Sequence, residues 1–191
     1  MSGAGTLAFL VLVLVLHAVQ PGLDPVGVTV SEYVLGAGGW LFTVGCVAWG
    51  LGSVALVVLL TGRGRTGRVL LAVWAVGMLL VAAFPTDPID RTNQVVHFTA
   101  AGIVHATAGQ LAFVCFGVAA VLLTRPERRR TPRLLAALCA ATLAFALVIT
   151  ALGQFHLFGL AERLLLPAYA AWSLLTTVHA CRETSLESEI T

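Results

Sequence analysis

The chain has 191 residues, of which 59% are hydrophobic and only 10% are charged, and its formal net charge is +2. A soluble domain of this length needs a larger polar surface, so the composition excludes an ordinary soluble domain and indicates a polytopic membrane protein. The four cysteines are isolated and form no CxxC pair, so we expect small core residues rather than disulfides or a thiolate metal site.

Six apolar runs are long enough to cross a bilayer, which takes about 20 helical residues. They cover residues 4–19, 40–60, 69–86, 98–123, 134–154 and 161–180. We therefore predict an all-α integral membrane bundle of six transmembrane helices, with one domain over residues 1–182 and a short polar tail over 183–191. The first run also has the apolar character of a signal peptide. No Lys or Arg precedes it and no clean small-x-small cleavage site follows, so cleavage is the less favoured alternative.

Arginine is concentrated on one side of this arrangement. The chain has eleven cationic side chains, all of them Arg, and nine fall in two alternate connections or after the last run: Arg63, Arg65, Arg68, Arg125, Arg128, Arg129, Arg130, Arg133 and Arg182. By the positive-inside rule, these segments and both termini are cytoplasmic. The absence of Lys and the abundance of Ala, Val, Leu, Gly and Arg are typical of a GC-rich bacterial genome. We therefore expect a multi-pass protein of the bacterial inner membrane.

A different set of polar residues gathers at the opposite ends of the runs. A helical residue rises about 1.5 Å, so about 20 residues carry the chain across the hydrocarbon core. Counted from the Arg-rich side, four runs reach one level at the following residues: Asp87, His105, Gln154 with His156, and Glu162 with Arg163. Such groups are costly near hydrocarbon unless they are paired or used. This predicts an outward-facing polar pocket, although helix ends also accept polar residues that only cap or pair.

Some residues of this layer are candidates for chemistry. Asp87 lies between two prolines in the segment 84–88 (FPTDP), which ends its span because proline cannot continue a helix. Asp87 and Glu162 are the general acid/base candidates, with His105 as their partner. Helix capping by Asp87 and an ion pair of Glu162 are the structural alternatives. The candidate substrate-binding residues lie near the same level or on the helical face of Glu162: Glu32, His97, Gln154, His156, Arg163, Tyr169 and Trp172.

Metal binding is not favoured by the spacing of the ligand-type residues. His105, Asp87 and His156 have side chains that bind zinc, but no HxxxH or HExxH spacing supports such a site. His97 and His105 are about 12 Å apart along a helix axis, too far to bind one ion together. We therefore predict neither a metal nor a cofactor.

Three short stretches, in their order along the chain, resemble a known family. They are VSEYVLGA at 30–37 leading into GWLF at 39–42, FPTDP at 84–88 followed by His97 and His105, and GLAER at 159–163 ahead of Trp172. Together they resemble the bacterial membrane proteins of the domain of unknown function 998 family, over roughly residues 5–180. The resemblance implies a compact six-helix bundle and brings no assigned activity. The positions that fall on the family's motifs are Glu32, Asp87, His105, Glu162 and Arg163.

Two classes of function remain open. The first is a membrane-embedded enzyme, such as a cyclase, isomerase or hydrolase, that acts on a lipid, isoprenoid, polyketide or other apolar small molecule. Carboxyl groups close to hydrocarbon favour the protonated form, which suits acid/base chemistry. The second is a non-enzymatic accessory, immunity or lipid-handling protein whose polar layer is structural. A transporter is less favoured, since only Gln110 continues the polar layer inward. As partners we expect membrane lipids and an apolar small molecule, and no nucleic acid.

Overall fold

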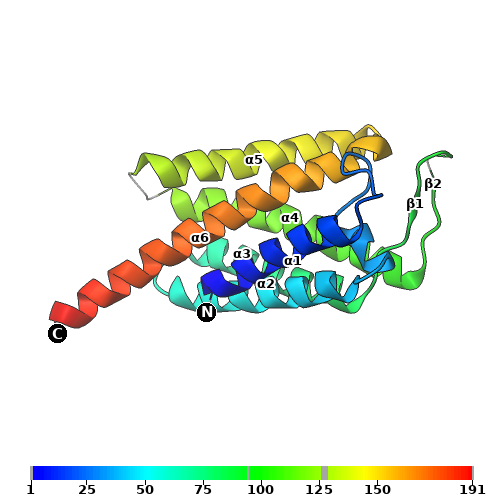
Figure 1. The fold of residues 1–191 in the computed structure, drawn as a ribbon. Coiled ribbons are helices and arrows are strands. Elements are labelled where there is room, and N and C mark those ends of the chain that lie inside the picture. The colour runs from blue at the N-terminus through cyan, green and yellow to red at the C-terminus, as the bar shows by residue number, and fades with distance from the viewer. Residues whose placement is uncertain (1, 94, 126–128, 191) are drawn as a thin grey trace.

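The computed structural model describes residues 2–93, 95–125 and 129–190. In this part of the chain six helices are long and apolar enough to cross a membrane, which confirms the predicted fold class (Figure 1). They are α1 (Ser2–Val19), α2 (Trp40–Leu59), α3 (Arg65–Ala83), α4 (Ala100–Thr124), α5 (Arg130–Ala151) and α6 (Phe158–Ile190). The protein is therefore a multi-pass membrane protein, and the polar tail continues α6 as helix.

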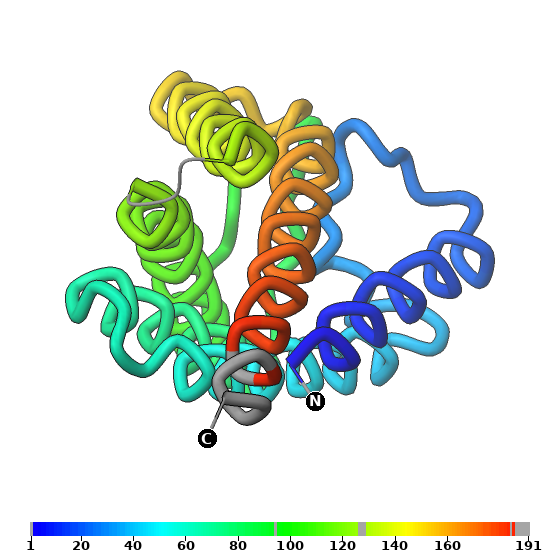
Figure 2. The backbone as a smooth tube through the Cα atoms, turned by 90° about the vertical axis from the view of Figure 1, so that its left-hand side faces the viewer, coloured from blue at the N-terminus to red at the C-terminus, as the bar shows by residue number. Residues whose placement is uncertain are grey.

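Helices that follow one another in the chain pack side by side, and α6 lies among the others. Figure 2, viewed from the end that holds the termini, shows α1 to α5 arranged around α6. The last helix packs chiefly against α5 and α1, with further contacts to α2 and α4. A buried position for α6 matters because its first turns carry Glu162 and Arg163 into the same end of the bundle.

The two ends of the bundle differ in what they carry. Both termini and the α2–α3 and α4–α5 connections lie at one end (Figure 1), which gathers the Arg-rich segments. Arg128 lies outside the described residues. The other end carries the connection 20–39, a short hairpin and the turn before α6. The structure thus separates the two classes of polar residue, while the direction of the bundle across the membrane remains a prediction.

The hairpin end is built from short elements. The connection 20–39 contains the 3-10 helix η1 (Ser31–Leu35), and a second one, η2 (Phe155–Leu157), precedes α6. Strands β1 (Ile89–Asp90) and β2 (Val95–Val96) pair antiparallel between α3 and α4. α3 ends at Ala83 because Pro85 disfavours a helical conformation at Phe84, which is extended with φ −117° and ψ 116°.

The interior is held by aromatic rings and close helix contacts. The fully buried Trp74 of α3 packs against Trp49, Phe116 and Tyr169, with ring centroids 5.1, 4.9 and 5.8 Å away. These rings come from α2, α4 and α6, so one side chain joins four helices. Aromatic pairs of this kind stabilise a core beyond the area they bury. The aromatic cluster closes the floor of the site described next.

Candidate functional site

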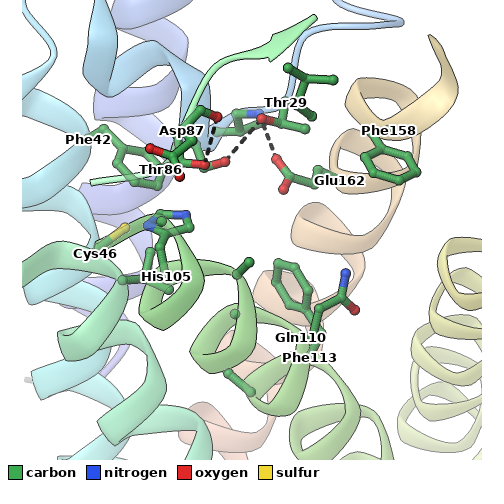
Figure 3. Close-up of a pocket in the computed structure, with 18 of the residues that line it drawn as sticks. Thr29, Phe42, Cys46, Thr86, Asp87, His105, Gln110, Phe113, Phe158 and Glu162 are labelled. Atoms are coloured by element: carbon green, nitrogen blue, oxygen red, sulfur yellow. Dashed lines mark hydrogen bonds between the residues drawn. The ribbon is translucent and has the colours of Figure 1, made fainter. Parts of the chain in front are cut away.

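A cavity of about 290 Å³ lies at the hairpin end of the bundle, above the aromatic core (Figure 3). Residues of all six long helices line it, together with η2, the connection 20–39 and the hairpin segment. Most of the lining is apolar. The polar side chains in it are Thr29, Ser31, Thr86, Asp87, His105, Gln110, Thr150 and Glu162. A mainly apolar cavity with a few converging polar groups is the usual form of a small-molecule site.

Asp87 sits at the amino end of α4. Its carboxylate accepts hydrogen bonds from the Thr99 backbone N–H at 2.7 Å and from Thr99 Oγ1 at 2.9 Å. Thr99 is the N-cap of α4 and accepts in turn from the Gly102 N–H at 3.1 Å. A carboxylate in this place satisfies a loose backbone donor and lies at the positive end of the helix dipole. Asp87 therefore caps α4, as the structural alternative proposed from the sequence expects. The same side chain also lines the cavity.

His105 belongs to α4 and lies deeper in the bundle than Asp87. It is buried, with 6% of its surface exposed. Its Nδ1 is 2.7 Å from the carbonyl oxygen of Phe84. A carbonyl can only accept, so Nδ1 carries the proton and the hydrogen bond fixes the orientation of the ring. Figure 3 shows the ring on the same side of the cavity as Asp87 and Cys46, with Glu162 across from it on α6.

Glu162 reaches the cavity from α6. Its Oε2 accepts a hydrogen bond of 2.6 Å from the backbone N–H of Val30, which lies in the connection 20–39. The three predicted catalytic residues thus come from three segments and line one cavity.

Arg163 does not line the cavity and binds the connection 20–39 and the end of α1. It donates to the carbonyl oxygen of Val28 at 2.6 Å, to Tyr33 Oη at 3.0 Å and to His17 Nε2 at 3.0 Å. Its guanidinium also lies 5.6 Å from the centre of the Tyr33 ring. The guanidinium therefore acts within the described structure as a clamp for the connection above the cavity.

The comparison with known families agrees with the motifs in the sequence. A family model described as "Protein of unknown function (DUF998)" matches residues 4–179. The chain belongs to the DUF998 family. The match covers most of the chain and confirms the resemblance, though it assigns no activity to any residue. No curated protein matches the chain, and no solved structure does.

In this DUF998 protein, Glu32 lies in the connection above the cavity without lining it. Its carboxylate pairs with Arg91 of the hairpin segment and accepts from Thr29 N and Oγ1, each at 2.9 Å, and from Ile89 N at 3.3 Å. Burial alone would raise the pKa of Glu32, but the hydrogen bonds from Arg91, Thr29 and Ile89 outweigh it and hold the pKa below its ordinary value. Glu32 is thus a charged link between two loops.

The other predicted substrate-binding residues also lie off the cavity. His97 and His156 are exposed, and Gln154 donates to its neighbour's carbonyl, Leu152 O, at 3.3 Å. Tyr169 and Trp172 are fully buried in the core. Tyr169 Oη donates to the Phe113 carbonyl oxygen at 2.7 Å, and Trp172 Nε1 donates to Thr124 Oγ1 at 3.0 Å.

Two physical reasons separate these residues from the site. The depth count along a helix gives the level of a residue and says nothing of the side on which it emerges. Tyr169 and Trp172 lie about two to three turns deeper along α6 than Glu162, at the level of the aromatic core. None of the seven predicted substrate-binding residues lines the cavity of this DUF998 protein.

The structure adds lining residues that sequence reasoning did not select. Six phenylalanines line the cavity: Phe9, Phe42, Phe98, Phe113, Phe155 and Phe158. Thr29, Thr86 and Gln110 contribute polar atoms. Gln110 carried a signal in the sequence, as an amide inside an otherwise apolar run, whereas the hydroxyls and rings had none.

The chemistry open to this site is proton transfer and hydrogen bonding. Among the described residues, no group of three or more His, Cys, Asp and Glu side chains comes together in a way that would hold a metal ion. Two carboxylates and one imidazole line a space closed largely by apolar groups. Arg91 and Arg163 bind the loops and do not belong to its lining.

Proposed function

We propose that the cavity binds a membrane-partitioned small molecule, such as a lipid, isoprenoid or polyketide, and acts on it by acid/base chemistry. One observation carries this proposal: Asp87, His105 and Glu162, from three different segments, line one mainly apolar cavity. Groups that can donate and accept protons would then face the ligand within a mainly apolar lining, which suits proton transfer to an apolar substrate.

In this proposal His105 and the carboxyl groups have separate tasks. The hydrogen bond from Nδ1 to the Phe84 carbonyl orients the imidazole and leaves Nε2 as the acceptor of the neutral ring. His105 then serves as a base toward the ligand. Asp87 and Glu162, held by Thr99 and Val30, donate or accept the second proton. We further propose that the cavity opens to the outer side of a bacterial inner membrane, because the Arg-rich segments lie at the opposite end.

The second candidate is a lipid-handling or accessory protein without catalysis. A specific observation favours it: each of the three residues also makes a hydrogen bond that joins parts of the backbone. Asp87 caps α4, His105 ties α4 to the end of α3, and Glu162 ties α6 to the connection 20–39. In that case the polar layer stabilises the bundle and a bound lipid is only carried.

Single conservative variants separate the two candidates. Asp87→Asn, His105→Gln and Glu162→Gln are expressed in the host, and two quantities are measured for each: the folded yield by gel filtration, and the apolar metabolites of the cells by mass spectrometry. The enzyme proposal expects near-normal folded yield with loss of a product that the wild type forms. Loss of folded protein in proportion to the loss of product refutes catalysis and favours the structural candidate.

A cavity-filling pair tests binding itself. At Gly109 an added Cβ meets only Val81 Cγ2, at 3.7 Å, so Gly109→Leu places a side chain in the cavity without backbone conflict. Thr107→Leu adds the same residue on an exposed face of α4 and is the matched control. We expect Gly109→Leu to lose co-purifying small molecules that Thr107→Leu retains. Equal retention by both variants refutes the cavity as the binding site.

A further inference from the structure

The cavity continues sideways between helices. A second, smaller space of about 50 Å³ lies between α4, α5 and α6. It shares six lining residues with the main cavity, so the two adjoin: Thr29, Gln110, Phe113, Thr150, Phe158 and Glu162. Its own lining includes Leu147, which is 40% exposed, while Gln110 and Thr150 are exposed as well. The space thus leads from Glu162 to the outer surface of α4 and α5, which faces lipid in a membrane.

Gln110 is an unusual residue for that surface. It lies five residues further into α4 than His105, about 7.5 Å along the helix axis below the polar level and so inside the bilayer core. Its side chain is exposed and makes no hydrogen bond within the described residues. An amide without a hydrogen-bond partner is costly next to hydrocarbon. The position of Gln110 therefore indicates that a polar group of a ligand occupies the space between α4, α5 and α6.

The charge of the lining restricts the occupant's head group. The described residues around the cavity include two carboxylates and no Arg, and the chain has no Lys. Arg91 and Arg163 bind carbonyl oxygens of the connection 20–39 instead. A phosphate or carboxylate head group would find no Arg or Lys in this lining to balance its charge. A hydroxyl or amine can donate hydrogen bonds to both.

We infer that the smaller space, here called the α4–α5 cleft, is a lateral portal through which a ligand enters the cavity from the bilayer. We infer further that this ligand is an amphiphile with a hydroxyl or amine head group. The head lies among Asp87, His105 and Glu162, and the alkyl chain passes Gln110 and Leu147 into the bilayer. This inference rests on the proposed binding function and adds to it the ligand class and its route of access.

Photolabelling in lipid nanodiscs tests the route. The probes are hexadecylamine, hexadecanol and hexadecyl phosphate, each with a diazirine in mid-chain, and hexylamine with a diazirine at its end. Labelled peptides are mapped by mass spectrometry. We expect the hexadecyl amine or alcohol, and not the phosphate, to label α4 around Phe113 and α5 around Leu147. The probe that labels these positions more strongly, the amine or the alcohol, identifies the head group.

Two variants on α5 isolate the portal. Ala146→Trp fills the cleft, whereas Ala144→Trp adds the same ring on an exposed face of α5. We expect Ala146→Trp to lower labelling by the hexadecyl amine or alcohol about tenfold. Labelling of its cavity by hexylamine should not change. In Ala144→Trp, labelling by every probe should remain at the wild-type level. Unchanged hexadecyl labelling in Ala146→Trp overturns the portal alone. Absence of cavity labelling by every probe in the wild type overturns the binding proposal as well.

A substitution at Gln110 completes the test. Gln110→Leu removes the amide and keeps a helix-forming side chain of similar size. We expect normal or higher folded yield and weaker labelling by the hexadecyl amine or alcohol. Labelling at the wild-type level refutes contact between the ligand and Gln110, and preferential labelling by the phosphate refutes the head-group assignment.

Discussion

At the scale of single residues, the position of Asp87 depends on a glycine in the first turn of the next helix. A Cβ added at Gly102 would collide with the Asp87 carboxylate. The carboxylate can therefore lie against the first turn of α4 and accept from Thr99 only because Gly102 has no side chain. Gly102, which has no reactive group, thus determines where the carboxylate of Asp87 can lie.

Two glycine substitutions on α4 test this dependence. Gly102→Ala forces the carboxylate of Asp87 off Thr99, and we expect a loss of about 1–3 kcal/mol in the free energy of unfolding, as for other overpacked sites. Gly109→Ala meets only Val81 at 3.7 Å and should be neutral or stabilising by up to about 1 kcal/mol. Thermal unfolding in one detergent compares them. Equal stability of the two variants would show that Asp87 is not held in this way.

At the scale of elements, the connection 20–39 is held over the cavity from two sides. Arg163 of α6 binds its Val28 carbonyl and Tyr33 hydroxyl, and Arg91 of the hairpin segment binds its Gly27 carbonyl and Glu32. Gly159 permits the close approach, because a Cβ there would collide with carbonyl oxygens of this connection. The connection therefore closes the cavity through charged contacts rather than apolar packing alone.

The Glu32–Arg91 pair makes this closure dependent on pH. Because the folded-state pKa of Glu32 is below its ordinary value of 4.5, the pair stabilises the closed connection above that pH. The stabilisation is lost as the pH falls through the folded-state pKa. We expect hydrogen-exchange protection at the backbone amides of Thr29 and Ile89, which donate to Glu32, to fall below about pH 4.5 after correction for intrinsic rates.

Variants of this pair and a matched control complete the prediction. Glu32→Gln should lower protection at neutral pH by about 1–3 kcal/mol, less than for a fully buried pair, because 25% of the Arg91 side chain is exposed. It should also remove the pH dependence. Asp90→Asn is the control, since among the described residues the Asp90 carboxylate accepts hydrogen bonds only from Thr92 and Asn93 of its own hairpin turn. A pH dependence that persists in Glu32→Gln would contradict the assignment.

At the scale of the whole molecule, hydropathy located the helices and depth counting located the level of the polar residues. The contacts between distant side chains could not be predicted in this way. The apolar runs located the six helices, with most ends within a few residues; the run at 134–154, for example, forms α5 over Arg130–Ala151. The exception is the last run, predicted to end at residue 180, because α6 continues to Ile190. Counting depth from the Arg-rich side placed Asp87, His105 and Glu162 at one level, and the structure brings all three to one cavity. Depth along a helix follows from a fixed rise per residue, so it is readable from sequence.

The rotation of a helix and the choice of its neighbours are not readable in that way. Gln154 and His156 were placed at the same level, but α5 ends at Ala151 and Gly153 turns the chain with φ 64°. The two side chains then follow the turn instead of the helix face. Glu32 depended on a partner in a different loop, Arg91, 59 positions along the chain. Long-range contacts of this kind come from packing, and no local pattern in the sequence marks them.

The orientation of the whole bundle is open to a direct test with two matched cysteines. Thr61 is exposed in the Arg-rich α2–α3 connection, and Thr92 is exposed in the hairpin at the opposite end. Three native cysteines are buried, so Cys181→Ser gives a suitable background. The positive-inside rule predicts that a membrane-impermeant maleimide labels Thr92→Cys in intact cells and Thr61→Cys only after permeabilisation. The reverse pattern would turn the cavity toward the cytoplasm, and labelling of both in intact cells would contradict their placement at opposite ends of a spanning bundle.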